Sequence, residues 1–120
     1  MIERAVLLAL DTLGNALAAA SESFGRAVRE VVVSLGGPAE STLIGDTARV
    51  SAANAVLANA TLAHGLDFDD TREDAIVHTG RVAATTALAV GEAIDARGPS
   101  VLEACRRRRA SCRLSDAAWR

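Results

Sequence analysis

The residues best suited to chemistry lie in one run, His64-Gly65-Leu66-Asp67-Phe68-Asp69-Asp70-Thr71, which is followed by His78. The run brings together three carboxylates within four positions, a hydroxyl group and, with His78, the two histidines of the chain. Carboxylates this close repel one another, so a buried one is expected to keep its proton near neutral pH. A protonated carboxyl group or a histidine can move protons on and off carbon. The run therefore indicates a proton-transfer site.

Other interpretations of the run stay open. If a helix continues through it, His64, Asp67 and Thr71 share one helical face. The aspartates can also simply cap the next element, with His64 as a hydrogen-bonded core residue. Residues 67–71 fit the pattern D-x-D-x-T and are similar to the nucleophile loop of haloacid-dehalogenase-type phosphatases, although residues 58–63 before them read as helix and not as a buried strand. A calcium loop is excluded, because Arg72 and His78 stand where that loop needs Gly and Glu.

Five helices are expected to position this run, giving an all-α bundle with no sheet of three or more strands. They cover about residues 2–20, 21–35, 51–64, 81–96 and from 100 onward. Ser21 or Ser23, Ser51 and Ser100 are the expected N-caps, and residues 36–38 end the second helix. The apolar positions that recur at helical spacing in the first two helices are Ile2, Val6, Ala9, Leu10, Leu13, Leu17 and Phe24, Ala27, Val28, Val31, Val32, Leu35.

Composition limits the class of protein. Half of the 120 residues are apolar, which argues against intrinsic disorder. Aromatic residues are few, so the core is expected to consist of Ala, Val and Leu.

No apolar run approaches the roughly 20 residues that a membrane span needs. The pair Cys105 and Cys112 fits neither a disulfide framework nor a zinc spacing. We expect a cytoplasmic protein with no membrane partner.

Charge is distributed unevenly along the chain. Residues 1–104 hold seven arginines against fourteen acidic residues, whereas residues 105–120 hold six arginines and one aspartate. The run Arg106 to Arg109 interrupts the apolar pattern of the fifth helix, and a nucleic-acid patch or a solvated helix end would explain it. We favour a frame error or a decayed gene end after residue 104, because CGN arginine codons shifted by one base become Val, Ala, Gly or Asp codons. No nucleic-acid partner is expected.

A longer match is carried by residues 55–71 together with Ile76-Val77-His78, which resemble the N-terminal region of the MmgE/PrpD family. Residues 3–5 and 11–14 are similar to the start of that family, and residues 49–51 to the approach to its third helix. The resemblance covers about residues 1–104. The chain departs from the family pattern at Ala60, where Gly is usual, and at Thr79, where Pro is usual.

The resemblance implies a function. The family includes 2-methylcitrate dehydratase of propionate catabolism, cis-aconitate decarboxylase and iminodisuccinate epimerase, and its members have a large helical domain, a smaller α/β lid domain and usually form homodimers. It implies a lyase or isomerase that transfers a proton next to a carboxylate of a small polycarboxylate, with no metal and no cofactor. Asp67 and His78 match catalytic positions, with His78 as proton donor or acceptor and Asp67 orienting it or sharing a proton. Thr71 matches a substrate-binding position.

The expected organisation is an N-terminal fragment of such an enzyme. Residues 1–104 would form part of the helical domain and residues 105–120 an aberrant arginine-rich tail. Family members are several times longer and carry further basic residues downstream, so the chain would hold half of a site and be inactive alone. The alternative is a non-catalytic helical remnant or interaction module.

Overall fold

The computed structural model describes residues 2–69 and 78–117, and within them the chain forms five helices and one two-stranded antiparallel pair. The predicted all-α fold is therefore confirmed. The elements are α1 (Ile2–Ala19), α2 (Ser23–Leu35), β1 (Ser41–Thr42), β2 (Arg49–Val50), α3 (Ala52–His64), α4 (Thr79–Ala93) and α5 (Gly98–Ala117).

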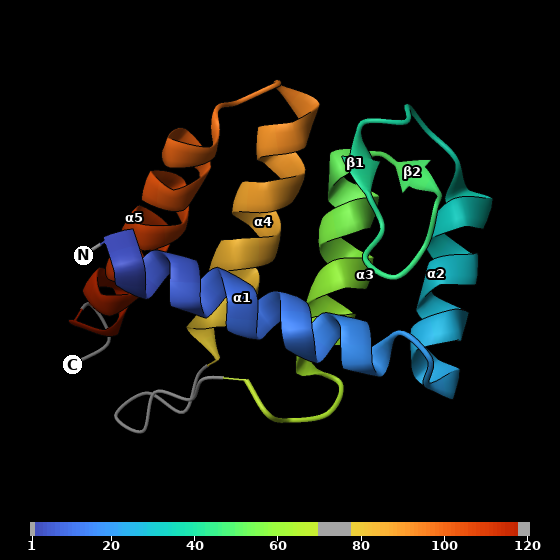
Figure 1. The fold of residues 1–120 in the computed structure, drawn as a ribbon, viewed down its shortest axis with the longest axis horizontal. Helices are drawn as coiled ribbons and strands as arrows, with labels where there is room; N and C mark the ends of the chain where they lie inside the picture. Colours follow the sequence, from blue (N-terminus) through green and yellow to red (C-terminus); the bar gives the residue numbers. More distant parts are fainter. Residues whose placement is uncertain (1, 70–77, 118–120) are drawn as a thin grey trace.

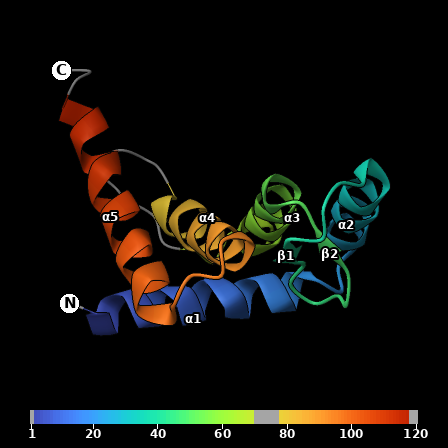
Figure 2. The same cartoon turned by 90° about the horizontal axis from the view of Figure 1, so that it is seen from above.

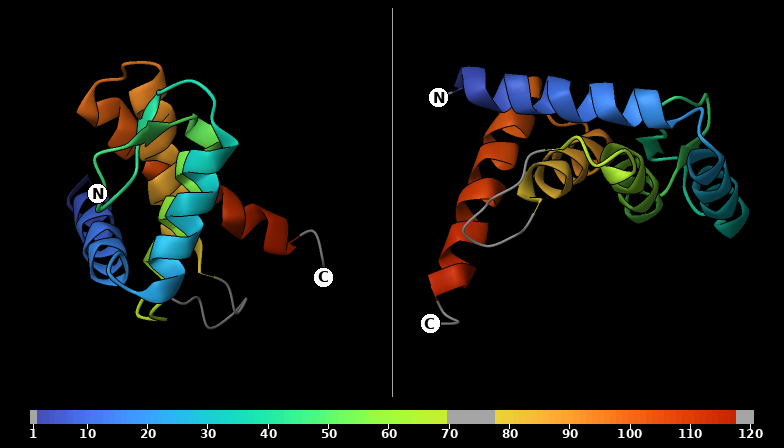
Figure 3. Two further views of the ribbon diagram at one scale, coloured as in Figure 1. Left: turned by 90° about the vertical axis from the view of Figure 1, so that its right-hand side faces the viewer. Right: turned by 90° about the horizontal axis from the view of Figure 1, so that it is seen from below.

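Four of the helices stand in a row, in the order α5, α4, α3 and α2 (Figure 2). The first helix, α1, crosses one side of this row and contacts α3, α4 and α5 (Figure 1). The same arrangement is seen from the side and from below in Figure 3. As a result α1 links the central pair, α3 and α4, to α5.

The core is built mainly from small aliphatic residues, as predicted. On α1 the buried positions are Ala5, Leu8, Thr12, Ala16 and Ala19, whereas Leu7, Leu10 and Leu17 are 57–65% exposed. The predicted apolar face of this helix is therefore only partly buried, with Val6, Ala9 and Leu13 half-buried and Leu10 and Leu17 exposed. The reason is that the side that packs against α3 and α4 carries small side chains that allow close approach. The larger buried residues from the other elements are Val32, Leu43 and Leu62.

The second helix buries a narrower stripe than its pattern predicts. Val32 is buried and Phe24 and Val28 are half-buried. The other members of the predicted face are exposed: Ala27, Val31 and Leu35. The reason is that α2 lies at the end of the row and packs mainly against α3. The predicted serine cap is also wrong, since Glu22 is the N-cap without a side-chain bond and Ser21 donates to the carbonyl of Ala18.

The strand pair is fixed on α3 by side-chain hydrogen bonds. Asn59 accepts from the backbone N–H of Ile44 at 3.0 Å and donates to the carbonyl of Thr42 at 2.9 Å. From the strand itself, the Ser41 hydroxyl donates to the carbonyl of Ala89 on α4 at 2.6 Å. The strand itself is two residues long, and its Ser41 pairs with Val50 of β2.

Helix boundaries differ from the prediction near the candidate site and at α5. Ser51 caps α3 as predicted, accepting from the N–H of Asn54 at 3.4 Å. Helix α4 starts at Thr79, two residues earlier than expected. Helix α5 already begins at Gly98, so Ser100 lies within its first turn and is not its cap. The backbone helix continues through the arginine run to Ala117.

Among the described helices, none is long and apolar enough by itself to cross a membrane; α1 and α2 reach that length and composition only as a pair, bent by 97° at their junction.

Candidate functional site

The candidate site lies where the chain leaves α3 and where it enters α4. Helix α3 ends at His64, and the N–H of Asp67 donates to the carbonyl of His64 at 2.8 Å. Asp67 has φ +57°, a left-handed conformation that is uncommon for residues other than glycine. The chain therefore turns away from the helix axis. The helix does not continue through the run, so the shared helical face that such a continuation would give to His64 and Asp67 does not form.

Asp69 is the centre of the site. Its side chain is only 2% exposed, and its Oδ1 lies 2.9 Å from Nδ1 of His64. The other oxygen, Oδ2, accepts from Nη1 of Arg81 at 3.0 Å. Nδ1 of His78 lies 3.3 Å from Oδ1. One buried carboxylate thus faces two histidines and an arginine that come from both sides of the 70–77 segment.

The charge of Asp69 follows from these contacts. Burial by itself raises the pKa of this carboxyl group, but the hydrogen bonds from His64 and Arg81 and the nearby histidine charges outweigh it and hold the pKa below its ordinary value. The expectation that a buried carboxylate in this run keeps its proton is therefore wrong for Asp69. The sequence could not show that an arginine from the next helix would reach it.

His64 cannot satisfy both of its polar neighbours with one ring nitrogen. Nδ1 of His64 lies 2.9 Å from Asp69, which can only accept, and 2.8 Å from Nη1 of Arg81, which can only donate. A protonated Nδ1 donates to Asp69, and an unprotonated one accepts from Arg81. Asp69 and Arg81 thus compete for the same nitrogen of His64, and the position of the His64 proton decides which of the two hydrogen bonds forms.

The two residues predicted to be catalytic lie next to each other. Nε2 of His78 is 4.0 Å from Oδ1 of Asp67, whose side chain is 81% exposed, while that of His78 is 20% exposed. The ring of His78 also lies against His64, with centroids 4.7 Å apart. Thr71, the predicted substrate-binding residue, lies outside the described residues. The site roles of all three stay predictions.

The same side chains include the donor atoms of a metal site. One ligand atom from each of His64, Asp67, Asp69 and His78 lies within 4.8 Å of the others. However, Arg81 already places its positive charge 3.0 Å from Asp69 and against His64, and a divalent cation at this point would be repelled by it. The described arrangement therefore fits an ion-pair network better than a metal centre. That no metal takes part stays a prediction.

Asp69 and Arg81 were not among the predicted catalytic and substrate-binding residues. Charge alone does not show which aspartate of the run turns inward. Arg81 flanks the run in the sequence, but the sequence did not show whether its side chain faces the carboxylates.

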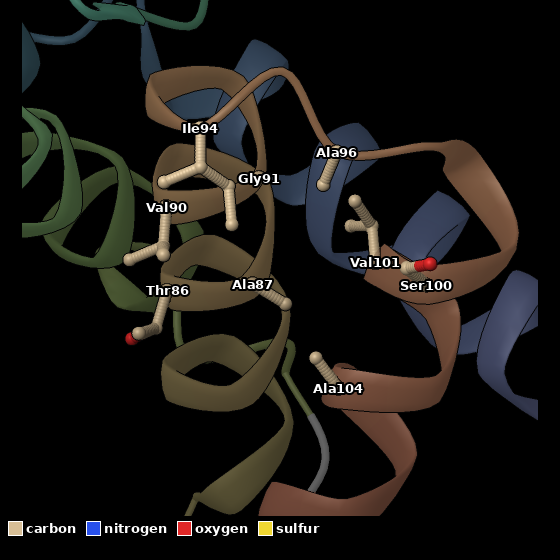
Figure 4. Close-up of a pocket in the computed structure, with 9 residues that line it drawn as sticks. All are labelled: Thr86, Ala87, Val90, Gly91, Ile94, Ala96, Ser100, Val101 and Ala104. Carbon is tan, nitrogen blue, oxygen red and sulfur yellow. The ribbon is translucent and has the colours of Figure 1, made fainter.

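A separate apolar pocket lies between α4 and α5, toward the C-terminal half of α4 (Figure 4). Its volume is about 230 Å³. Its described lining carries no titratable side chain, so this pocket cannot supply proton transfer. The lining residues are Thr86, Ala87, Val90, Gly91, Ile94, Ala96, Ser100, Val101 and Ala104.

The phosphatase alternative is overturned by the element before the run. A nucleophile loop of that type follows a buried β-strand, whereas residues 52–64 form the helix α3. The D-x-D-x-T pattern of residues 67–71 is therefore no guide to function here.

Comparison with protein families gives one match. Residues 1–107 match the family model of the MmgE/PrpD N-terminal domain. The matched region contains α1 to α4, the candidate site and the first turns of α5. No curated protein and no solved structure matches the chain.

Proposed function

Because the chain belongs to the MmgE/PrpD family, we propose that it supplies one side of a proton-transfer site of a lyase or isomerase that acts on small polycarboxylates. The nearest reaction type is the dehydration carried out by 2-methylcitrate dehydratase. The observation that carries the proposal is the pair formed by His78 and Asp67, with Nε2 and Oδ1 4.0 Å apart at the edge of a buried charge network.

The chemistry of such a dehydration needs two proton movements. A base removes a proton from the carbon next to a carboxylate, and an acid protonates the hydroxyl group that leaves as water. His78 serves as the base or the acid, because an imidazole side chain can both accept and donate a proton. Asp67, exposed beside it, orients the imidazole or shares the proton. A positioned group of this kind contributes about 10²–10⁴-fold to the rate.

Binding the substrate requires positive charge that this part of the site does not supply. The chain has no lysine, and Arg81 is engaged with Asp69. A polycarboxylate next to Asp67 and Asp69 would be repelled unless cations offset their charge. We therefore place the substrate-holding cations on other parts of the assembled enzyme, which we propose to be a homodimer. Neither a metal nor a cofactor is part of the proposed reaction.

A second candidate function, a non-catalytic interaction module, is favoured by the exposed apolar residues. Leu7, Leu10 and Leu17 are each more than half exposed along α1, and Ile94 at the pocket is 70% exposed. Apolar side chains gathered on a surface are typical of surfaces that contact other proteins. In this case the chain would contribute its helical surface and no chemistry.

The test is a chimeric enzyme. Residues 1–107 of this chain replace the corresponding region of a 2-methylcitrate dehydratase of the family, and dehydration of 2-methylcitrate is measured. We expect activity, and we expect His78→Ala to lower kcat by about 10²–10⁴-fold. The matched control is Asp46→Asn, which alters an exposed carboxylate paired with Arg29 away from the site.

Two outcomes contradict the proposal. In one, the chimera is active and His78→Ala keeps the full rate. In the other, the chimera folds and assembles but has no activity, which favours the interaction module. Circular dichroism and sedimentation of each protein separate loss of folding from loss of chemistry.

A further inference from the structure

We propose that Asp69, fixed by Arg81, is a positioning residue that keeps the proton of neutral His78 on Nδ1 and so leaves the lone pair of His78 on Nε2, beside Asp67. This inference rests on the proposed function, because it assigns the atom through which His78 acts. It adds two residues, Asp69 and Arg81, to the residues predicted for the site.

The contacts of His78 with two carboxylates favour one tautomer of its neutral imidazole. An ionised carboxylate can only accept hydrogen bonds. Oδ1 of Asp69 lies 3.3 Å from Nδ1 of His78, which is closer than the 4.0 Å between Nε2 of His78 and the exposed Asp67. The nearer, buried carboxylate therefore attracts the proton of a neutral His78 to Nδ1 more strongly than Asp67 attracts it to Nε2. The other nitrogen, Nε2, then carries the lone pair.

Asp69 is held in place and kept ionised by its neighbours. Its side chain is 2% exposed, and Arg81 donates to Oδ2, which leaves Oδ1 facing the two imidazoles. Arg81 is on the first turn of α4, and His78 is the residue just before that helix. The arginine and the histidine therefore arrive at Asp69 on the same short piece of backbone, which fixes their relative position.

The tautomer of His78 decides which of its nitrogens can accept a proton from the substrate. The nitrogen of a histidine that acts as a base is set by the hydrogen bond that its other nitrogen makes. When a carboxylate that orients a catalytic histidine is replaced by an amide, the geometry is kept but the wrong tautomer is favoured. The same reasoning predicts that Asp69→Asn would present an N–H to Nδ1 of His78 and move the His78 proton to Nε2.

The experiment reads this tautomer directly. The full 120-residue chain is labelled with ¹⁵N, and long-range ¹H–¹⁵N spectra are recorded at a pH where the imidazoles are neutral. The variant His64→Gln assigns the two histidines. In the wild-type chain we expect His78 to show the shift of an unprotonated nitrogen at Nε2 and that of a protonated one at Nδ1. In Asp69→Asn this pattern is expected to reverse.

The matched control is Asp46→Asn, which removes the same charge from another arginine–aspartate pair and is expected to leave His78 unchanged. If Asp69→Asn does not fold, Arg81→Gln is measured, and a loss of the Nδ1–H preference of His78 is expected. A wild-type His78 with its proton on Nε2 overturns the proposal, and so does an Asp69→Asn or Arg81→Gln chain that folds and keeps the wild-type pattern. Because the tautomer is read without turnover, these results are independent of whether the chimera is active.

Discussion

The rings of His64 and His78 lie with their centroids 4.7 Å apart and tilted by 58°, although one residue ends α3 and the other precedes α4. Both direct Nδ1 toward the same oxygen of Asp69. A single carboxylate thus joins the ends of the two central helices at the candidate site. Changes at Asp69 are therefore expected to affect folding as well as chemistry.

Asp69→Asn is expected to lower the free energy of unfolding by about 1–3 kcal/mol at neutral pH, because Arg81 is left beside a group that carries no charge. The pKa of Asp69 in the folded chain is held below its ordinary value. The Asp69 carboxylate therefore makes its full contribution to the free energy of unfolding above the ordinary aspartate pKa of about 3.9. This contribution is lost as the pH falls below that value toward the pKa of the folded chain. Urea unfolding of both proteins between about pH 7 and about pH 2 measures the difference, which should shrink in acid. A difference that stays constant over this range contradicts the prediction.

Gly25→Ala is expected to destabilise the chain by about 1–3 kcal/mol, since an added methyl group overpacks this contact. A Cβ at this position would lie 2.4 Å from the carbonyl oxygen of Ala19 and 2.8 Å from Cδ2 of Leu62. The matched control is Gly14→Ala on α1, where no atom lies within 4 Å of the added Cβ. That substitution is expected to stabilise the chain by about 0.5–1 kcal/mol. Equal effects on the melting temperature at the two positions would refute the close contact between α2 and α3.

Asn59→Ala is expected to cost about 1–3 kcal/mol, because it removes the partners of the Ile44 N–H and the Thr42 carbonyl. Amide hydrogen exchange should show faster exchange at Ile44. The matched control is Asn54→Ala. The Asn54 side chain donates an exposed hydrogen bond to the carbonyl of Gly36, and its removal is expected to lower the free energy of unfolding by less than about 0.5 kcal/mol. Unchanged protection of Ile44 in the Asn59 variant would show that this bond does not hold the strand pair.

The 120-residue chain, made alone, is expected to have no 2-methylcitrate dehydratase activity. General acid–base catalysis supplies only about 10²–10⁴-fold, and the electrostatic stabilisation that such a reaction also needs requires cations that the described site lacks. Exposed apolar side chains such as Leu10 and Ile94 are expected to make it associate. The assay uses protein of verified mass, with light scattering for its size. A monodisperse monomer that turns over the substrate, and that loses this activity on His78→Ala, would disprove the expectation.

Much of the fold could be predicted because helical periodicity, Gly36 and the Ser51 cap are local signals. The buried side of each helix was less predictable, since it depends on which neighbours cover it: Leu10 and Val31 fit an apolar face and yet are exposed. Close packing of the helices favoured small residues such as Ala16 on α1 instead.

The sequence of the run and His78 predicted that carboxylates and histidines meet at the candidate site, but it did not predict how they are arranged. Composition and spacing do not show which of Asp67 and Asp69 is buried, and only the turn after α3 makes one exposed and the other buried. The charge state of Asp69 depends on Arg81, which belongs to a different helix. Contacts between segments of this kind leave no periodic signal in the sequence.

The left-handed backbone of Asp67 sets stability against the catalytic role that we propose for this residue. Glycine adopts this conformation at little steric cost, so Asp67→Gly would relieve the backbone while removing the carboxylate that faces His78. A protein under selection for folding alone would gain from that exchange, whereas one under selection for catalysis would not. Among sequences descended from a common ancestor with this one, glycine at position 67 is therefore the expected mark of a lineage in which the chemistry has been given up.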